Sequence, residues 1–80
     1  MRNTLGQPSV PSMDLTIEFD REEDGRWIGA VPEIPGCLVY GATREEARRK
    51  VVALALAVLA ERVEQGEIVD PERITFTQAA

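Results

Sequence analysis

The fold is decided first by residues 14–31, DLTIEFDREEDGRWIGAV, which have the pattern of two strands joined by a tight turn. Polar and apolar residues alternate strictly from Asp14 to Asp20, as in a strand with one buried face. The apolar members of this strand are Leu15, Ile17 and Phe19. Asp24-Gly25 then supplies the left-handed backbone conformations of a hairpin turn, and Arg26–Val31 follows as the second strand.

Further short strands are expected on the C-terminal side of this hairpin. Residues 32–36, PEIPG, form a rigid connection, because the two prolines fix φ and Gly36 can adopt a positive φ. Cys37–Tyr40 then has the pattern of a third strand, which ends at Gly41. After the turn signal Asp70-Pro71, Arg73–Thr77 is predicted as a closing strand.

The clearest helix signal lies between the third strand and the closing strand. Thr43-Arg44-Glu45-Glu46 is a capping box, in which the Thr43 hydroxyl accepts from the Glu46 N–H and the Glu46 side chain reaches back. The helix is expected to run from Arg44 to about Glu64, with Gly66 as its C-terminal stop.

The middle of this helix is apolar almost all round. We expect one stripe to pack against Leu15, Ile17 and Phe19 of the sheet, and it contains Ala47, Val51, Leu54, Ala55 and Val58. A second set is predicted to form an interface between copies of the chain: Ala53, Leu56, Ala57 and Ala60. The alternative is that the alanines of this set are exposed only because alanine favours helix.

These elements predict an α+β fold with the order β-β-β-α-β. Three consecutive strands followed by one helix favour an antiparallel sheet with the helix packed on one face. Residues 13–80 are expected to form a single domain, preceded by a disordered lead-in over residues 1–12.

The bulk composition narrows the class of partner. The chain has 80 residues and a formal net charge of −5, so phosphate backbones would repel it and direct nucleic-acid binding is disfavoured. A basic protein partner is favoured instead. The N-terminus has no signal-peptide pattern, and the longest apolar run, Val51–Ala60, is about half the length that a membrane-spanning helix needs. We expect a cytoplasmic protein.

The residues offer little catalytic chemistry. The chain has no histidine and one cysteine, which excludes histidine-based triads and metal sites built from Cys and His. Cys37, at the start of a short strand, is interpreted as a small core residue rather than a nucleophile. The glycines match no phosphate-binding loop. We therefore expect a protein that is not an enzyme and has no cofactor or metal.

Acidic residues are concentrated in the first hairpin, and Arg21 is the one basic residue within positions 14–24. The set consists of Asp14, Glu18, Asp20, Glu22, Glu23 and Asp24. Three interpretations are open: a solvated strand face that keeps the edge soluble, an acidic docking surface for a basic partner, and, least favoured, a magnesium site. We predict that this set binds the partner.

Two segments resemble a known family. Residues 24–37, DGRWIGAVPEIPGC, are similar to the strand and "V-P-D-L-P-G-C" turn of HicB-like antitoxins, and residues 41–47, GATREEA, resemble the "G-D-T-x-E-E-A" helix start of that family. The two segments have the spacing of the family. Glu33 and Ala42 depart from the pattern, because both positions usually hold aspartate.

The resemblance implies a partly degraded RNase H-like fold without catalysis. In the family this module covers the active site of HicA, a small basic toxin that cuts mRNA, and a DNA-binding domain usually follows the module. With 80 residues, this chain resembles the short, stand-alone members. Two alternative functions are therefore expected. One is an antitoxin-like module that caps a basic toxin, and the other is a stand-alone homo-oligomer of regulatory or unknown role. A metal-dependent hydrolase ranks below both.

Overall fold

The computed structural model describes residues 13–67 and 73–79, which form one four-stranded sheet and one helix. The elements are β1 (Met13–Arg21), β2 (Trp27–Ala30), β3 (Leu38–Gly41), α1 (Arg44–Glu64) and β4 (Ile74–Gln78). The predicted α+β class and the order β-β-β-α-β are confirmed, and every boundary lies within one residue of its expected place. The predicted lead-in over residues 1–12 lies outside the described residues.

The sheet is mixed, so the expectation of an antiparallel sheet was wrong for one strand. The spatial order is β3-β2-β1-β4, and β2 runs antiparallel to both of its neighbours. β4 runs parallel to β1, with Met13 opposite Ile74 and Ile17 opposite Gln78. The reason is the crossover. α1 carries the chain from the end of β3 back along the sheet, so β4 starts where β3 started and has the same direction.

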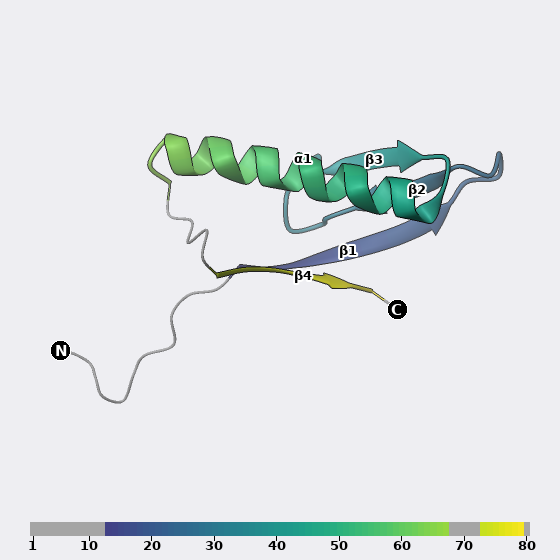
Figure 1. The fold of residues 1–80 in the computed structure, drawn as a ribbon, viewed down its shortest axis with the longest axis horizontal. Helices are drawn as coiled ribbons and strands as arrows, with labels where there is room; N and C mark the ends of the chain where they lie inside the picture. The colour runs from purple at the N-terminus through teal and green to yellow at the C-terminus, as the bar shows by residue number, and fades with distance from the viewer. Residues whose placement is uncertain (1–12, 68–72, 80) are drawn as a thin grey trace, which may run out of the picture.

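The core lies between α1 and one face of the sheet (Figure 1). The helix contributes a buried stripe at every fourth position: Ala47, Val51, Ala55 and Leu59. Leu15 and Ile17 of β1 face this stripe, and the loop between β2 and β3 adds Val31, Ile34 and Cys37. Leu54 and Val58, which were predicted as members of this stripe, are only half-buried. α1 lies mainly over β2 and β3 and only marginally over β1, which rotates the buried stripe toward Leu59.

The helix approaches the sheet closely at two glycines. A Cβ on Gly41 would lie 2.5 Å from the Ala47 backbone nitrogen, and a Cβ on Gly29 would lie 2.9 Å from the Ala47 carbonyl oxygen. All three residues are buried. The absence of side chains on β2 and β3 therefore lets the first turns of α1 rest directly on the sheet.

The predicted helix ends are confirmed. The Thr43 hydroxyl accepts from the Glu46 N–H at 3.0 Å, and the Glu46 carboxylate accepts from the Ala42 N–H at 2.6 Å. That second bond holds the pKa of Glu46 below its usual range, with help from the nearby charge of Lys50. Gly66 follows the helix with a φ of 82°, which is the left-handed conformation of a C-terminal stop.

Candidate protein-binding surface

α1 covers one face of the sheet, and among the described residues no second layer covers the opposite face (Figure 1). We call this opposite side the open face. The strand register arranges its side chains in two rows across β1, β2 and β3. One row consists of Glu18, Ala30 and Leu38, and the other consists of Asp20, Ile28 and Tyr40. Each row therefore runs from an acid on β1 to a large apolar side chain on β3.

The half of the open face on β2 and β3 is apolar. Leu38 and Tyr40 are 49% and 42% exposed, and Ile28 and Ala30 beside them are half-buried. The Arg26 guanidinium lies 4.4 Å from the centre of the Tyr40 ring, a cation–π contact at the end of the row. Contiguous apolar patches on a small domain mark interaction sites more often than isolated exposed residues do.

The half of the open face on β1 is acidic. Asp14, Glu18 and Asp20 alternate along the strand and are exposed. The salt bridges found among the described residues involve none of them. Glu18 and Asp20, two of the six predicted partner-binding residues, therefore lie beside the apolar patch, while Asp14 lies farther along β1, where the strand pairs with β4.

The other three predicted residues lie in the turn between β1 and β2, where Glu22 and Asp24 take part in hydrogen bonds of the hairpin. Asp24 accepts from the Arg26 backbone N–H at 3.0 Å and forms a salt bridge with the Arg26 Nε at 2.7 Å. The Arg26 backbone bond is the main reason that the pKa of Asp24 is lowered. Glu22 closes the turn through its backbone, while Glu23 is exposed. Asp24 therefore stabilises the hairpin, and its charge is offset by Arg26.

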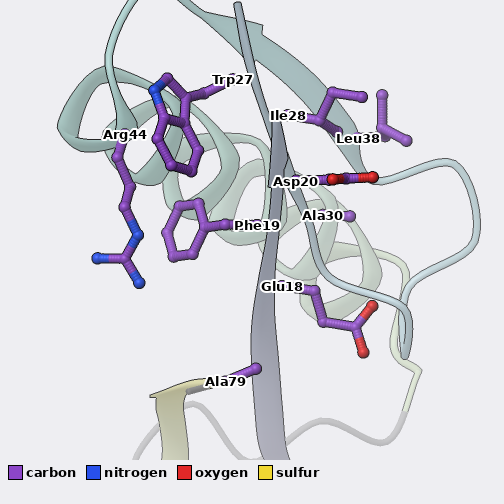
Figure 2. Close-up of a pocket in the computed structure, with 9 residues that line it drawn as sticks. All are labelled: Glu18, Phe19, Asp20, Trp27, Ile28, Ala30, Leu38, Arg44 and Ala79. Atoms are coloured by element: carbon purple, nitrogen blue, oxygen red, sulfur yellow. The ribbon is translucent and has the colours of Figure 1, made fainter. Parts of the chain in front are cut away.

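A hollow of about 670 Å³ lies around the edge of β1 that faces away from β2, near the C-terminal end of the strand. Figure 2 shows its lining side chains on both sides of the strand. Phe19, Trp27 and Arg44 lie on the helix side, where the Arg44 guanidinium is 4.2 Å from the centre of the Phe19 ring. The open-face side is lined by Glu18, Asp20, Ile28, Ala30 and Leu38. Ala79, directly after β4, closes one end.

The predicted oligomer interface lies on the outer surface of α1. Its members Ala53, Leu56, Ala57 and Ala60 are all exposed. Leu56 and Ala60 also line a smaller hollow of about 220 Å³ between α1 and β4, together with Val63. The structure thus places this set on the surface, and its role as an interface stays a prediction.

Cys37 occupies the core position that the sequence predicted. It is 4% exposed, its thiol donates to the Val51 carbonyl oxygen over 3.9 Å, and burial raises its pKa. Within residues 13–67 and 73–79, no three acidic or thiol side chains come together as metal ligands. No helix of the same residues is both long and apolar enough to cross a bilayer.

The sequence interpretation missed the apolar half of the open face. The signal was present, because both β2 and β3 carry apolar residues on both of their faces: Ile28 and Ala30 opposite Trp27, and Leu38 and Tyr40 opposite Val39. Strands of this kind are typical of sheets that are covered on both sides.

Comparisons with known proteins give one local match. UPF0150 protein Ta0767 of Thermoplasma acidophilum is 40% identical over 35 residues, which are 44% of this chain and 51% of that protein. The chain thus matches about half the length of this curated relative, which gives a coarse link to the UPF0150 group. No protein-family model matches the chain, and no solved structure matches it.

Proposed function

We propose that this chain is a non-catalytic protein-binding domain of the antitoxin type, which caps a small basic toxin of the HicA kind. The observation that carries the proposal is the open face, where exposed acids on β1 lie beside the half-buried apolar residues of β2, and exposed apolar residues of β3 follow on the other side of β2. A fully desolvated apolar centre with a charged rim is the usual composition of a protein interface.

The acidic and apolar halves would contribute differently to such a complex. Asp14, Glu18 and Asp20 would steer a basic protein toward the surface and orient it. Tyr40, an aromatic residue with a polar tip, and Leu38 would supply the contacts that hold the complex once it has formed. This division assigns the turn residue Asp24 to folding rather than to binding.

Two further observations support the proposal. The segments that resemble HicB-like antitoxins form the β1–β2 turn, the β2–β3 connection and the start of α1, so their residues have structural roles here. The local match to a UPF0150 protein agrees with the resemblance, because that group is in general HicB-like. A toxin that cuts mRNA works in the cytoplasm, where we place this chain as well.

The direct experiment is to titrate the purified chain into a purified HicA-type toxin while RNA cleavage is measured, after a search of the neighbouring genes for a small basic protein of this kind. Cleavage should stop near equimolar ratio as a complex forms. Undiminished cleavage at a large molar excess, with no complex detected by calorimetry, would contradict the proposal.

A second candidate is a stand-alone homo-oligomer without a toxin. It is favoured by the outer surface of α1, where Leu56 and Val63 are 45% and 41% exposed beside a hollow. Light scattering at concentrations on the order of tens of micromolar decides this point, since oligomer populations follow mass action. A monomer at these concentrations rules the second candidate out.

A further inference from the structure

β3 lacks the features that usually keep an edge strand from pairing. It lies at the margin of the sheet opposite β4, with β2 on its inner side and, among the described residues, no strand on its outer side. Edge strands are commonly protected by charged side chains, prolines or bulges. Residues 37–42, CLVYGA, contain no charge and no proline, and the register of β3 with β2 has no bulge. β3 is therefore chemically suited to pair with a further strand.

The direction of the β3 backbone groups follows from its pairing with β2. The Val31 N–H donates to the Cys37 carbonyl oxygen at 3.0 Å. In an antiparallel pair, alternate residues bond to the same side, so the residues between them in the alternation, Leu38 and Tyr40, direct their N–H and carbonyl groups to the outer edge.

Two of these four outward groups have partners within the chain. The Leu38 N–H donates to the Gly36 carbonyl oxygen at 3.0 Å, and the Tyr40 carbonyl oxygen accepts from the Lys50 Nζ at 3.5 Å. The hydrogen bonds among the described residues do not use the other two, which are the Tyr40 N–H and the Leu38 carbonyl oxygen. One donor and one acceptor, two residues apart, are thus left on the edge.

We propose that a second copy of this chain pairs with β3 about a two-fold axis, so that the two sheets become one. With the axis at Val39, Leu38 lies opposite Tyr40 of the second copy. The Tyr40 N–H then donates to the Leu38 carbonyl oxygen of the second copy, and the symmetry repeats the bond. The pairing uses the donor and the acceptor that the chain leaves over. The Leu38 and Tyr40 side chains also form aliphatic–aromatic pairs across the seam.

The flank of α1 above this edge suits a second copy as well. Lys50, which reaches the Tyr40 carbonyl, marks that flank, and Leu54 and Ala57 follow it at helical spacing. Leu54 is half-buried and Ala57 is exposed. Ala57 belongs to the predicted oligomer interface, whereas Leu56 of the same set lies on the opposite flank, beside β4.

The distances agree with packing between the two helices. α1 lies over both β2 and β3, because Gly29 and Gly41 both approach Ala47. A paired strand lies about 4.8 Å from β3, so the axes of the two helices would be roughly 10 Å apart, close to the usual distance between packed helices. An isolated partner strand would leave the flank of α1 uncovered, and this favours a second copy as the occupant.

The charges do not oppose this pairing. The acids of the open face lie on β1, two strands from β3, so the acids of the two copies would be roughly 24 Å apart, well beyond the Debye length of about 8 Å. Near the edge, Lys50 and Glu46 form a salt bridge with each other. The dimer would join the apolar halves of two open faces into one band with acids at both margins. This inference goes beyond the proposed function and does not require the toxin.

Amide hydrogen exchange of the full chain, followed by NMR, tests the central bond of the pairing. Between about 10 μM and about 1 mM protein, light scattering should show a shift from monomer to dimer. Exchange of the Tyr40 N–H should slow by about tenfold or more over the same range, because the ladder bond protects that amide. Protection that does not change with concentration would mean that the edge is occupied from within one chain, and it would overturn the proposal.

Two variants of one residue separate the backbone bond from the side chain. Tyr40→Pro removes the outward N–H at a position on an edge strand, where proline is tolerated. Tyr40→Ala removes the same ring and keeps the N–H. With both variants folded in thermal unfolding, the dissociation constant of the dimer should be at least about tenfold higher for Tyr40→Pro than for Tyr40→Ala, since only the proline removes both symmetry-related bonds. Equal dissociation constants would contradict strand pairing.

Charged variants test the register of the seam. A chain with Leu38→Lys and Tyr40→Lys, and a chain with Leu38→Glu and Tyr40→Glu, should each be monomeric, because like charges lie opposite each other. An equimolar mixture should form a heterodimer, which also shows that both variants fold. Leu56→Lys, on the opposite flank of α1, is the control and should dimerise like wild type.

The inference fails if wild type stays monomeric, if either doubly charged variant dimerises alone, if their mixture does not associate, or if Leu56→Lys abolishes the dimer. Each of these outcomes leaves the proposed function untouched, because a monomer can still inhibit the toxin. A chain that dimerises through β3 but does not inhibit the toxin removes the proposed function and keeps this inference.

Discussion

At the scale of single residues, the contact of α1 with β2 and β3 depends on two strand residues that have no side chain. Gly29 and Gly41 leave room for Ala47, so α1 lies almost directly on β2 and β3. A glycine inside a strand indicates a bulge or a close approach, but the sequence does not say what approaches. The contact with Ala47 was therefore beyond sequence analysis, whereas the Thr43–Glu46 cap was predictable because both partners lie in one short motif.

Adding a single methyl group at this contact should destabilise the fold. Gly41→Ala would place a Cβ 2.5 Å from a backbone nitrogen, so the helix must shift, at a cost of about 1–3 kcal/mol. Gly29→Ala, with its 2.9 Å approach to the Ala47 oxygen, should cost less. Urea unfolding gives the free energy of unfolding of both variants, and Gly41→Ala should be the less stable of the two. A Gly41→Ala variant as stable as wild type would show that α1 lies farther from the sheet.

Glu33, one of the two departures from the HicB-like pattern, makes a hydrogen bond to the sheet. Its carboxylate accepts from the Thr16 backbone N–H at 3.0 Å, at a point on β1 that β2 no longer reaches. This bond holds the pKa of Glu33 below its usual range. The Glu33 side chain therefore supplies the acceptor for a β1 backbone N–H that has no partner on β2.

The lowered pKa predicts how stability depends on pH. Folding favours ionised Glu33, so the contribution is present above the ordinary glutamate pKa of about 4.3. It is lost as the pH falls through the lower pKa of the folded protein. Glu33→Gln should therefore lose less stability than wild type when acidified below about pH 4.3. Denaturant unfolding between neutral and acid pH tests this, with Glu61→Gln as a charge-matched control; parallel curves for all three proteins would contradict it.

At the scale of elements, the sequence predicted every strand and the helix but not how they meet. Local alternation and the capping box identify elements because those signals lie within a few residues. The parallel pairing of β4 and the rotation of α1 toward Leu59 depend on contacts between distant segments. An apolar arc as wide as that of α1 allows several rotations of the helix, and only the position of β2 and β3 selects one of them.

Two leucines on α1 test the rotation. Leu59 is 2% exposed and Leu56 is 45% exposed, and both are changed to alanine, which favours helix. Leu59→Ala should cost about 2–5 kcal/mol as a core truncation, while Leu56→Ala should stay within about 0.5 kcal/mol as a surface change. Half-buried Leu54→Ala should fall between them in thermal unfolding. Equal costs for Leu59 and Leu56 would place the buried stripe elsewhere.

At the scale of the whole molecule, one helix on a four-stranded sheet leaves the open face uncovered among the described residues. The acidic half of that face was predictable, because Asp14, Glu18 and Asp20 alternate within one strand. The apolar half was not identified, since β3 has only four residues and its outward side depends on its pairing with β2. Only the assembled sheet shows that acids and apolar residues lie side by side.

The acids should act on the encounter with a basic partner. The pair Glu18→Gln and Asp20→Asn should slow association several-fold at low salt and flatten its salt dependence, with little change in dissociation. Glu61→Gln with Glu64→Gln changes the net charge equally at the far end of α1 and should slow association less. Stopped-flow measurements on both variants decide this, and equal slowing would mean that net charge alone matters.

The central claim is that the open face binds the partner, and two matched double variants test it most directly. Leu38→Ala with Tyr40→Ala removes apolar groups from the open face, and Leu56→Ala with Val63→Ala removes groups of similar exposure from α1. Calorimetry with the toxin should show the first variant weakened by more than about 2 kcal/mol, the level of an interface hot spot, while the second binds like wild type. Loss of binding in the α1 variant, with wild-type affinity in the open-face variant, would contradict the account.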